Sequence, residues 1–89
     1  MKNDGKGESI LKFQVLVDSF EKIERFVKVT NSSNYDIDLV SGRDVYLDAK
    51  SIMGILSCNI QKPMTVIVNC KDEEENQRIK AGLAEYIIA

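Results

Sequence analysis

The residues best placed to do chemistry in this 89-residue chain run Lys50-Ser51-Ile52-Met53-Gly54. Their serine lies at the predicted start of a short helix, where a hydroxyl can accept a phosphate group and free backbone amides favour the resulting anion. The chain contains no histidine, so it lacks the side chain that most often carries a proton near neutral pH. The pattern therefore indicates a regulated contact surface rather than a catalytic centre.

A second polar segment, Asp18-Ser19-Phe20-Glu21, precedes the first predicted helix. Asp18 and Glu21 have the spacing of a capping box, in which the two side chains satisfy free amides at the helix end. We therefore predict a helix that starts at about Ser19, with Asp18 as its cap.

Cysteines and aspartates form two further sets that could bind metals. Cys58 and Cys70 have no histidine or third cysteine with which to complete a zinc site, so we expect reduced, inert thiols. Four aspartates alternate along a predicted hairpin, which favours a solvated acidic face over the convergent geometry that a metal needs. They are Asp36, Asp38, Asp44 and Asp48. We expect no metal and no cofactor.

Composition and length exclude several classes of protein. A chain this short forms one domain, and its hydrophobic fraction of 44% with 29% charged residues is typical of globular proteins. Its apolar stretches are far shorter than the roughly 20 residues of a membrane-spanning helix. The net charge is −2 and the 12 basic residues are scattered, so we expect no direct binding to nucleic acid.

The chain also lacks the motifs of an enzyme and of a secreted protein. It has no glycine-rich phosphate loop and no nucleophile beside a base, so we expect no catalysis of its own. Residues 1–9 are polar and lack the apolar core of a secretory signal. We predict that residues 1–9 form a flexible lead-in and that residues 10–89 form a cytoplasmic domain.

The apolar periodicity predicts the elements that position these side chains, in the order β-α-β-β-α-β-α. Asp48 and Asp72 are the predicted caps of the second and third helices. The predicted elements are a strand at residues 11–17, a helix at 19–30, a hairpin with strands at 35–39 and 45–48, a helix at about 49–57, a strand at 64–69 and a closing helix at about 73–88.

Each predicted helix has one apolar face. These faces consist of Phe20, Ile23, Val27 and Thr30 in the first helix, Ile52, Ile55 and Leu56 in the second, and Ile79, Leu83 and Tyr86 in the third. A four-stranded antiparallel sheet with all three helices on one face would bury each apolar face once. The predicted fold class is therefore α+β, an open-faced β-sandwich.

This element order, with Lys50-Ser51-Ile52-Met53-Gly54 at the start of the second helix, resembles the HPr family of phosphocarrier proteins of the bacterial sugar phosphotransferase system. The resemblance covers about residues 10–88 and includes the hairpin that ends in Val45-Tyr46-Leu47. In HPr proteins the loop before the first helix carries a histidine that accepts a phosphoryl group from enzyme I. Here that loop reads Asp18-Ser19-Phe20-Glu21, so the resemblance implies a degenerate active-site loop.

The chain retains the serine of the family motif. In HPr proteins of Gram-positive bacteria, the serine of this motif is phosphorylated from ATP by HPr kinase/phosphorylase, and the product is a corepressor for a transcription factor of carbon catabolite control. Ser51 matches that position. The resemblance also implies a partner surface of Lys50, Ser51, Ile52 and Met53, with core packing as the alternative that we expect for Ile52.

Two functional hypotheses remain open at the level of sequence. The first is a regulatory or partner-binding protein controlled at Ser51, whose partners are that kinase, the transcription factor or phosphotransferase-system enzymes. The second is an HPr-fold interaction module, with dimerisation as one form of it, in which Ser51 is unmodified. Glu21 could also imitate a phosphorylated histidine through its fixed charge, although helix capping explains it with fewer assumptions.

Overall fold

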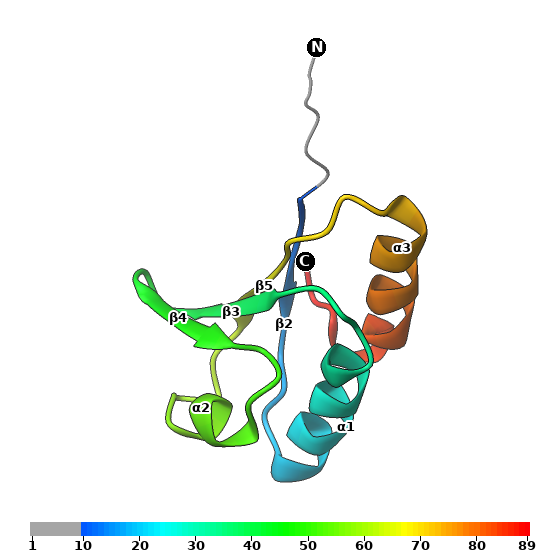
Figure 1. The fold of residues 1–89 in the computed structure, drawn as a ribbon. Helices are drawn as coiled ribbons and strands as arrows, with labels where there is room; N and C mark the ends of the chain where they lie inside the picture. The colour runs from blue at the N-terminus through cyan, green and yellow to red at the C-terminus, as the bar shows by residue number, and fades with distance from the viewer. Residues whose placement is uncertain (1–9) are drawn as a thin grey trace.

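The computed structural model describes residues 10–89, and its elements follow the predicted order (Figure 1). The predicted lead-in at residues 1–9 lies outside the described residues. The elements are β2 (Leu11–Val15), α1 (Phe20–Asn31), β3 (Ile37–Ser41), β4 (Val45–Asp48), α2 (Ile52–Leu56), β5 (Met64–Val68), α3 (Glu73–Gly82) and the 3-10 helix η1 (Ala84–Tyr86).

The four strands form one antiparallel sheet in the order β2-β5-β3-β4. Side chains alternate between its two faces, as β5 shows: Met64, Val66 and Val68 are buried, whereas Thr65 and Ile67 are only half-buried. The buried face meets the helices, and the other face is open. The predicted open-faced α+β sandwich is confirmed.

The hydrophobic core lies between the helices and the covered face of the sheet. Its largest fully buried side chains come from α1, α2, α3, the strands and the residue that follows α3; they include Phe26, Ile23, Ile37, Leu39, Ile55, Met64, Ile79 and Leu83. Phe26 also makes an edge-to-face contact with Tyr86, with ring centroids 6.4 Å apart. Residues from both ends of the described chain therefore meet in one core.

The start of α1 differs from the prediction. Ser19, not Asp18, caps the helix: its hydroxyl accepts a hydrogen bond from the Lys22 amide at 3.2 Å. The Asp18 carboxylate instead pairs with the Lys22 ammonium group at 2.9 Å. Phe20 is 51% exposed rather than buried. Because the buried stripe of α1 is centred on Ile23 and Phe26, the first helical residue lies at its margin.

The second helix also has a different cap. The Ser51 hydroxyl accepts from the Gly54 amide at 3.1 Å, whereas the Asp48 carboxylate accepts from the Lys50 amide in the preceding turn. The helix ends at Leu56, whose side chain is 39% exposed, and only Ile55 is fully buried. A helix of five residues has room to bury only one side chain deeply, so the prediction that Leu56 is buried was wrong.

The third helix begins as predicted and ends early. The Asp72 carboxylate accepts hydrogen bonds from the amides of Glu74 and Glu75, so it is the cap. The predicted helix to residue 88 was wrong beyond Gly82, because η1 follows and the last residues run along β2. There Gln14 donates to the Ala89 carbonyl and accepts from the Ile88 amide, both at 2.9 Å. Residues 86–89 thus cover the outer edge of β2.

The hairpin of β3 and β4 turns through Gly42, whose φ of +66° is a conformation that favours glycine. Val45, which the alternation places on the core side, is 50% exposed.

No helix among residues 10–89 has the length and apolar character needed to cross a membrane.

Candidate partner-binding site

Ser51 lies at the junction of β4 and α2, half-buried, with its hydroxyl on the first turn of the helix. Its amide donates to the Asp48 carbonyl at 3.0 Å. A Cβ atom at position 54 would lie 3.3 Å from the Ser51 hydroxyl oxygen, which is a crowded distance. Glycine at position 54 therefore gives the serine oxygen space and supplies the amide that binds it.

The turn before Ser51 is tied to the C-terminal end of α1 by three hydrogen bonds. The Thr30 hydroxyl donates to the Ala49 carbonyl at 2.8 Å, and the Asn31 amide group donates to the Lys50 carbonyl at 3.1 Å. The Lys50 ammonium group donates to the Ser33 carbonyl at 2.8 Å. Lys50, predicted as a partner-binding residue, thus has a structural role in this turn.

Large apolar side chains are exposed on α2 and at the start of α1. Met53 is 78% exposed and Leu56 is 39% exposed on α2, and Phe20 adds a third such side chain at the start of α1. The Gln61 side chain, from the loop after α2, donates to the Asp18 carbonyl at 3.4 Å and joins this loop to the segment before α1. We call Phe20, Met53 and Leu56 the apolar surface.

The sequence analysis identified part of this surface. Met53 is exposed as predicted, whereas Ile52 is half-buried and packs against the core, which was the expected alternative for it. Leu56 was missed, because it was assigned to a buried helix face. Phe20 was assigned to such a face and also to the degenerate active-site loop. Both residues fall on the apolar period of their helices, so the sequence pattern alone did not separate them from buried positions.

The segment Asp18-Ser19-Phe20-Glu21 has no array of groups suited to phosphoryl transfer. The hydrogen bond from Lys22 lowers the pKa of the Asp18 carboxyl, and the Ser19 hydroxyl is engaged as the helix cap. Glu21 is exposed in the first turn of α1, where a negative charge is favourable. The predicted box between Asp18 and Glu21 does not form, because Ser19 takes the capping role.

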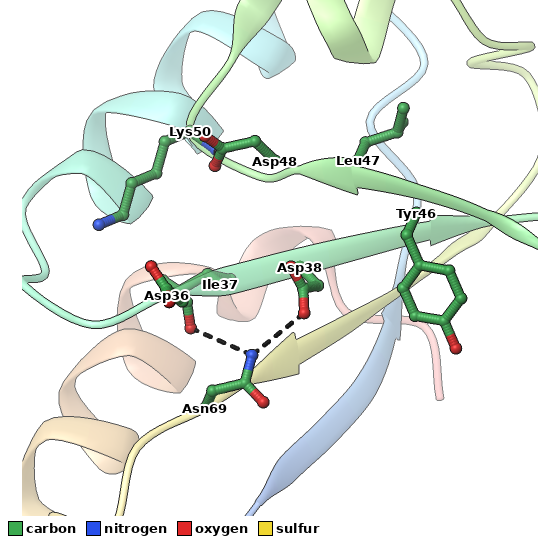
Figure 2. Close-up of a pocket in the computed structure, with 8 residues that line it drawn as sticks. All are labelled: Asp36, Ile37, Asp38, Tyr46, Leu47, Asp48, Lys50 and Asn69. Atoms are coloured by element: carbon green, nitrogen blue, oxygen red, sulfur yellow. Dashed lines mark hydrogen bonds between the residues drawn. The ribbon is translucent and has the colours of Figure 1, made fainter.

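Three of the four hairpin aspartates lie together. Asp36, Asp38 and Asp48 line a groove of about 400 Å³ on the open side of the sheet, with Asn69 at its base (Figure 2). Within residues 10–89, no group of three or more acidic, cysteine or histidine side chains is arranged to hold a metal ion. Cys58 and Cys70 are both free thiols, the second of them buried.

Fold and site together define the class: a small open-faced α+β sandwich whose candidate site is a serine-capped helix beside an exposed apolar surface. A family model described as the phosphorylation site of the phosphotransferase-system HPr component matches residues 22–87, and the chain belongs to the HPr family. The match begins at Lys22, so the segment from Asp18 to Glu21 lies outside it.

A solved structure supports the same fold. The chain is similar to a crystal structure of a phosphocarrier protein HPr from Bacillus anthracis str. Ames, with a TM-score of 0.60 and 24% sequence identity. The similarity covers 85% of this chain and 99% of the other. No curated protein matches the chain.

Proposed function

We propose that this HPr-family chain binds protein partners through the apolar surface and the start of α2, and that phosphorylation of Ser51 controls this binding. The observation that carries the proposal is the 78% exposure of Met53, two positions after a serine that starts a helix. An exposed side chain of this size beside other apolar groups is typical of a protein contact site. A phosphate group at Ser51 would place a dianion at the edge of that contact.

The local geometry of Ser51 is compatible with modification. Transfer of the γ-phosphoryl group of ATP to the serine oxygen would release ADP and one proton, and would add about −1.5 to −2 charges at pH 7. The amides at the start of α2 favour an anion there, and Gly54 leaves space around the oxygen. In this proposal the added charge changes partner binding rather than the fold.

Phosphate transfer through histidine is outside this proposal, because the chain has none. A carboxylate such as Glu21 would form only a reactive acyl phosphate. The side chain of Arg25, the nearby arginine of α1, forms an ion pair of 4.0 Å with Glu85 instead. We therefore propose a regulatory or binding protein of the phosphotransferase system rather than an enzyme or a phosphocarrier. Its proposed setting is the bacterial cytoplasm, and its proposed partners are HPr kinase/phosphorylase, a catabolite-control transcription factor or phosphotransferase-system enzymes.

The test is the intact mass of the protein after incubation with HPr kinase/phosphorylase and ATP. We expect a gain of one phosphate group, which the Ser51→Asn variant loses. Asparagine is the matched control because it is a good helix cap and has no hydroxyl. An HPr with its motif serine, present in the same tube, shows that the kinase is active. If that HPr is modified and this chain is not, control by this kinase is excluded.

The second candidate is an interaction module in which Ser51 is never modified. The hydrogen bond from the Gly54 amide to the Ser51 hydroxyl favours it, because helix capping alone explains a serine here. In this case Ser51→Asn leaves partner binding unchanged, whereas Met53→Asp on the apolar surface weakens it. Sedimentation of the purified chain over a range of concentrations shows whether the partner is a second copy.

A further inference from the structure

The two outer edges of the sheet differ. Residues 86–89 cover the edge of β2, but among residues 10–89 no segment pairs with the outer edge of β4. The Ala49 amide donates to the Ile37 carbonyl at 3.0 Å. Because antiparallel pairing alternates, Tyr46 and Asp48 direct their main-chain groups outward. The Tyr46 amide and carbonyl and the Asp48 amide are thus available to a further strand.

An unusual pair of charges lies beside this free edge. Asp38 and Asp48 are directly opposite each other on β3 and β4, and opposite residues point to the same face of a sheet. Like charges in this position are destabilising. The ion pairs formed within residues 10–89 include neither carboxylate, and the Lys50 ammonium group donates to the Ser33 carbonyl instead. Lys50 lines the same groove (Figure 2), but its ammonium group forms no ion pair with Asp38 or Asp48.

The charges surround a groove that could hold a side chain. Asp36, just before β3, and Asp38 on β3 face Asp48 on β4 across it in Figure 2, and its volume is about 400 Å³. The Asn69 side chain donates to the Asp38 carboxylate at 3.1 Å and fixes it in place. The lining holds three carboxylates and one cation, Lys50, so an arginine or lysine side chain, which has only hydrogen-bond donors and a positive charge, complements the remaining acidic groups.

We propose that the free edge of β4 binds an extended segment of a partner protein by strand addition, with an arginine or lysine opposite Asp48 entering the groove. Main-chain hydrogen bonds to Tyr46 and Asp48 supply affinity, and the basic side chain supplies specificity. This surface lies on the open face of the sheet, whereas the apolar surface lies on helices of the covered face. The inference therefore stands independently of the proposed function.

The probe is a displayed library of random eight-residue peptides, selected on the 89-residue chain. We expect selected peptides with alternating apolar residues and one fixed basic position. Their affinity is then measured by fluorescence anisotropy. Asp48→Asn should weaken binding by roughly tenfold or more, the loss typical of a charge-assisted hydrogen bond. Asparagine retains the oxygen that accepts from the Lys50 amide, and Asp44→Asn, in the hairpin turn, is the matched control.

A second pair of variants tests the main-chain contact. Tyr46→Pro removes an amide that points outward, so the hairpin should still fold, because proline is tolerated on the solvent side of an edge strand. It should abolish binding of the selected peptides. Tyr46→Val keeps the amide and should retain binding. Thermal unfolding of both variants verifies that they are folded.

Several outcomes would overturn the proposal. One is a selection that yields no enriched peptide, and another is peptide binding that is insensitive to Tyr46→Pro or to Asp48→Asn. If the Met53→Asp variant no longer binds the selected peptides, those peptides bind the apolar surface. That result contradicts strand addition but supports the apolar surface as a contact site. A dimer of the purified chain that Tyr46→Pro dissociates would show that a second copy occupies this edge, and the proposal would be wrong.

Discussion

Thr30 on α1 and Ala49 before α2 are joined inside the core by a hydrogen bond of 2.8 Å from the threonine hydroxyl to the alanine carbonyl. Both residues have no exposed surface. The bond fixes the turn that leads into Ser51, so the end of α1 helps to position the candidate phosphorylation site. Because the carbonyl is buried, its donor cannot be replaced readily by water.

Thr30→Val should destabilise the protein. Valine has nearly the same shape but leaves the Ala49 carbonyl without this donor, which costs about 1–3 kcal/mol for a buried group. Urea denaturation measures the change in the free energy of unfolding. Thr30→Ser keeps the hydroxyl and is the control. A Thr30→Val protein as stable as the parent would show that this hydrogen bond makes no net contribution.

Substitutions at Ser51 should separate its capping role from its modification. Ser51→Ala removes the acceptor for the Gly54 amide and should lower the free energy of unfolding by about 0.5–2 kcal/mol. Ser51→Asn should stay close to the parent, because asparagine is an equally good cap. Denaturant titration measures both values. Equal stability of the alanine variant and the parent would argue against a capping role.

The contact between α1 and α3 depends on a glycine. A Cβ atom on Gly82 would lie 2.8 Å from a methyl carbon of Val29. We expect Gly82→Ala to destabilise the protein, because overpacking costs about 1–3 kcal/mol and exceeds the gain of up to about 1 kcal/mol in helix propensity. Thermal unfolding measures the effect.

A double variant tests whether that clash is the cause. In a Val29→Ala background, the obstructing methyl carbon is absent, so Gly82→Ala should destabilise much less than it does alone. Additive effects of the two substitutions would mean that the loss at Gly82 has another origin.

Acid should weaken one ion pair on the surface of α3. Two hydrogen bonds from Arg78, of 2.9 and 2.8 Å, lower the pKa of the Glu75 carboxyl from 4.5 to about 2. A lowered pKa means that the stabilisation is complete above about pH 4.5 and is lost as the pH falls toward 2. Glu75→Gln should therefore flatten the fall in stability across this range, as followed by thermal unfolding at each pH.

The control for this effect is Glu74→Gln, on an exposed neighbour that makes no ion pair with the described basic side chains. It removes a charge from the same helical turn without breaking an ion pair, so it should flatten the pH dependence of stability less than Glu75→Gln does. An unaltered profile in Glu75→Gln would contradict the assignment of this acid sensitivity to the Glu75 and Arg78 pair.

The fold class followed from local pattern. Apolar residues alternate in β5 and β2, and they recur with the helical period around Ile23 and Ile79. These spacings are properties of the sequence alone, and they determine which apolar side chains share a face of each element. The motif around Ser51 was likewise visible without coordinates. The element order and the open-faced sandwich were therefore predicted correctly.

The caps and edges were decided only by the tertiary structure. Asp18 and Asp48 have side chains that are suitable for helix caps. In the structure, however, the hydroxyl groups of Ser19 and Ser51 accept the hydrogen bonds from the helix amides. The exposure of Phe20 and the course of residues 86–89 along β2 depend on how far the helices extend over the sheet. Asp38 and Asp48 lie opposite each other because of the register between β3 and β4. The register is a property of how the strands pair, and the spacing of these residues along the sequence does not determine it.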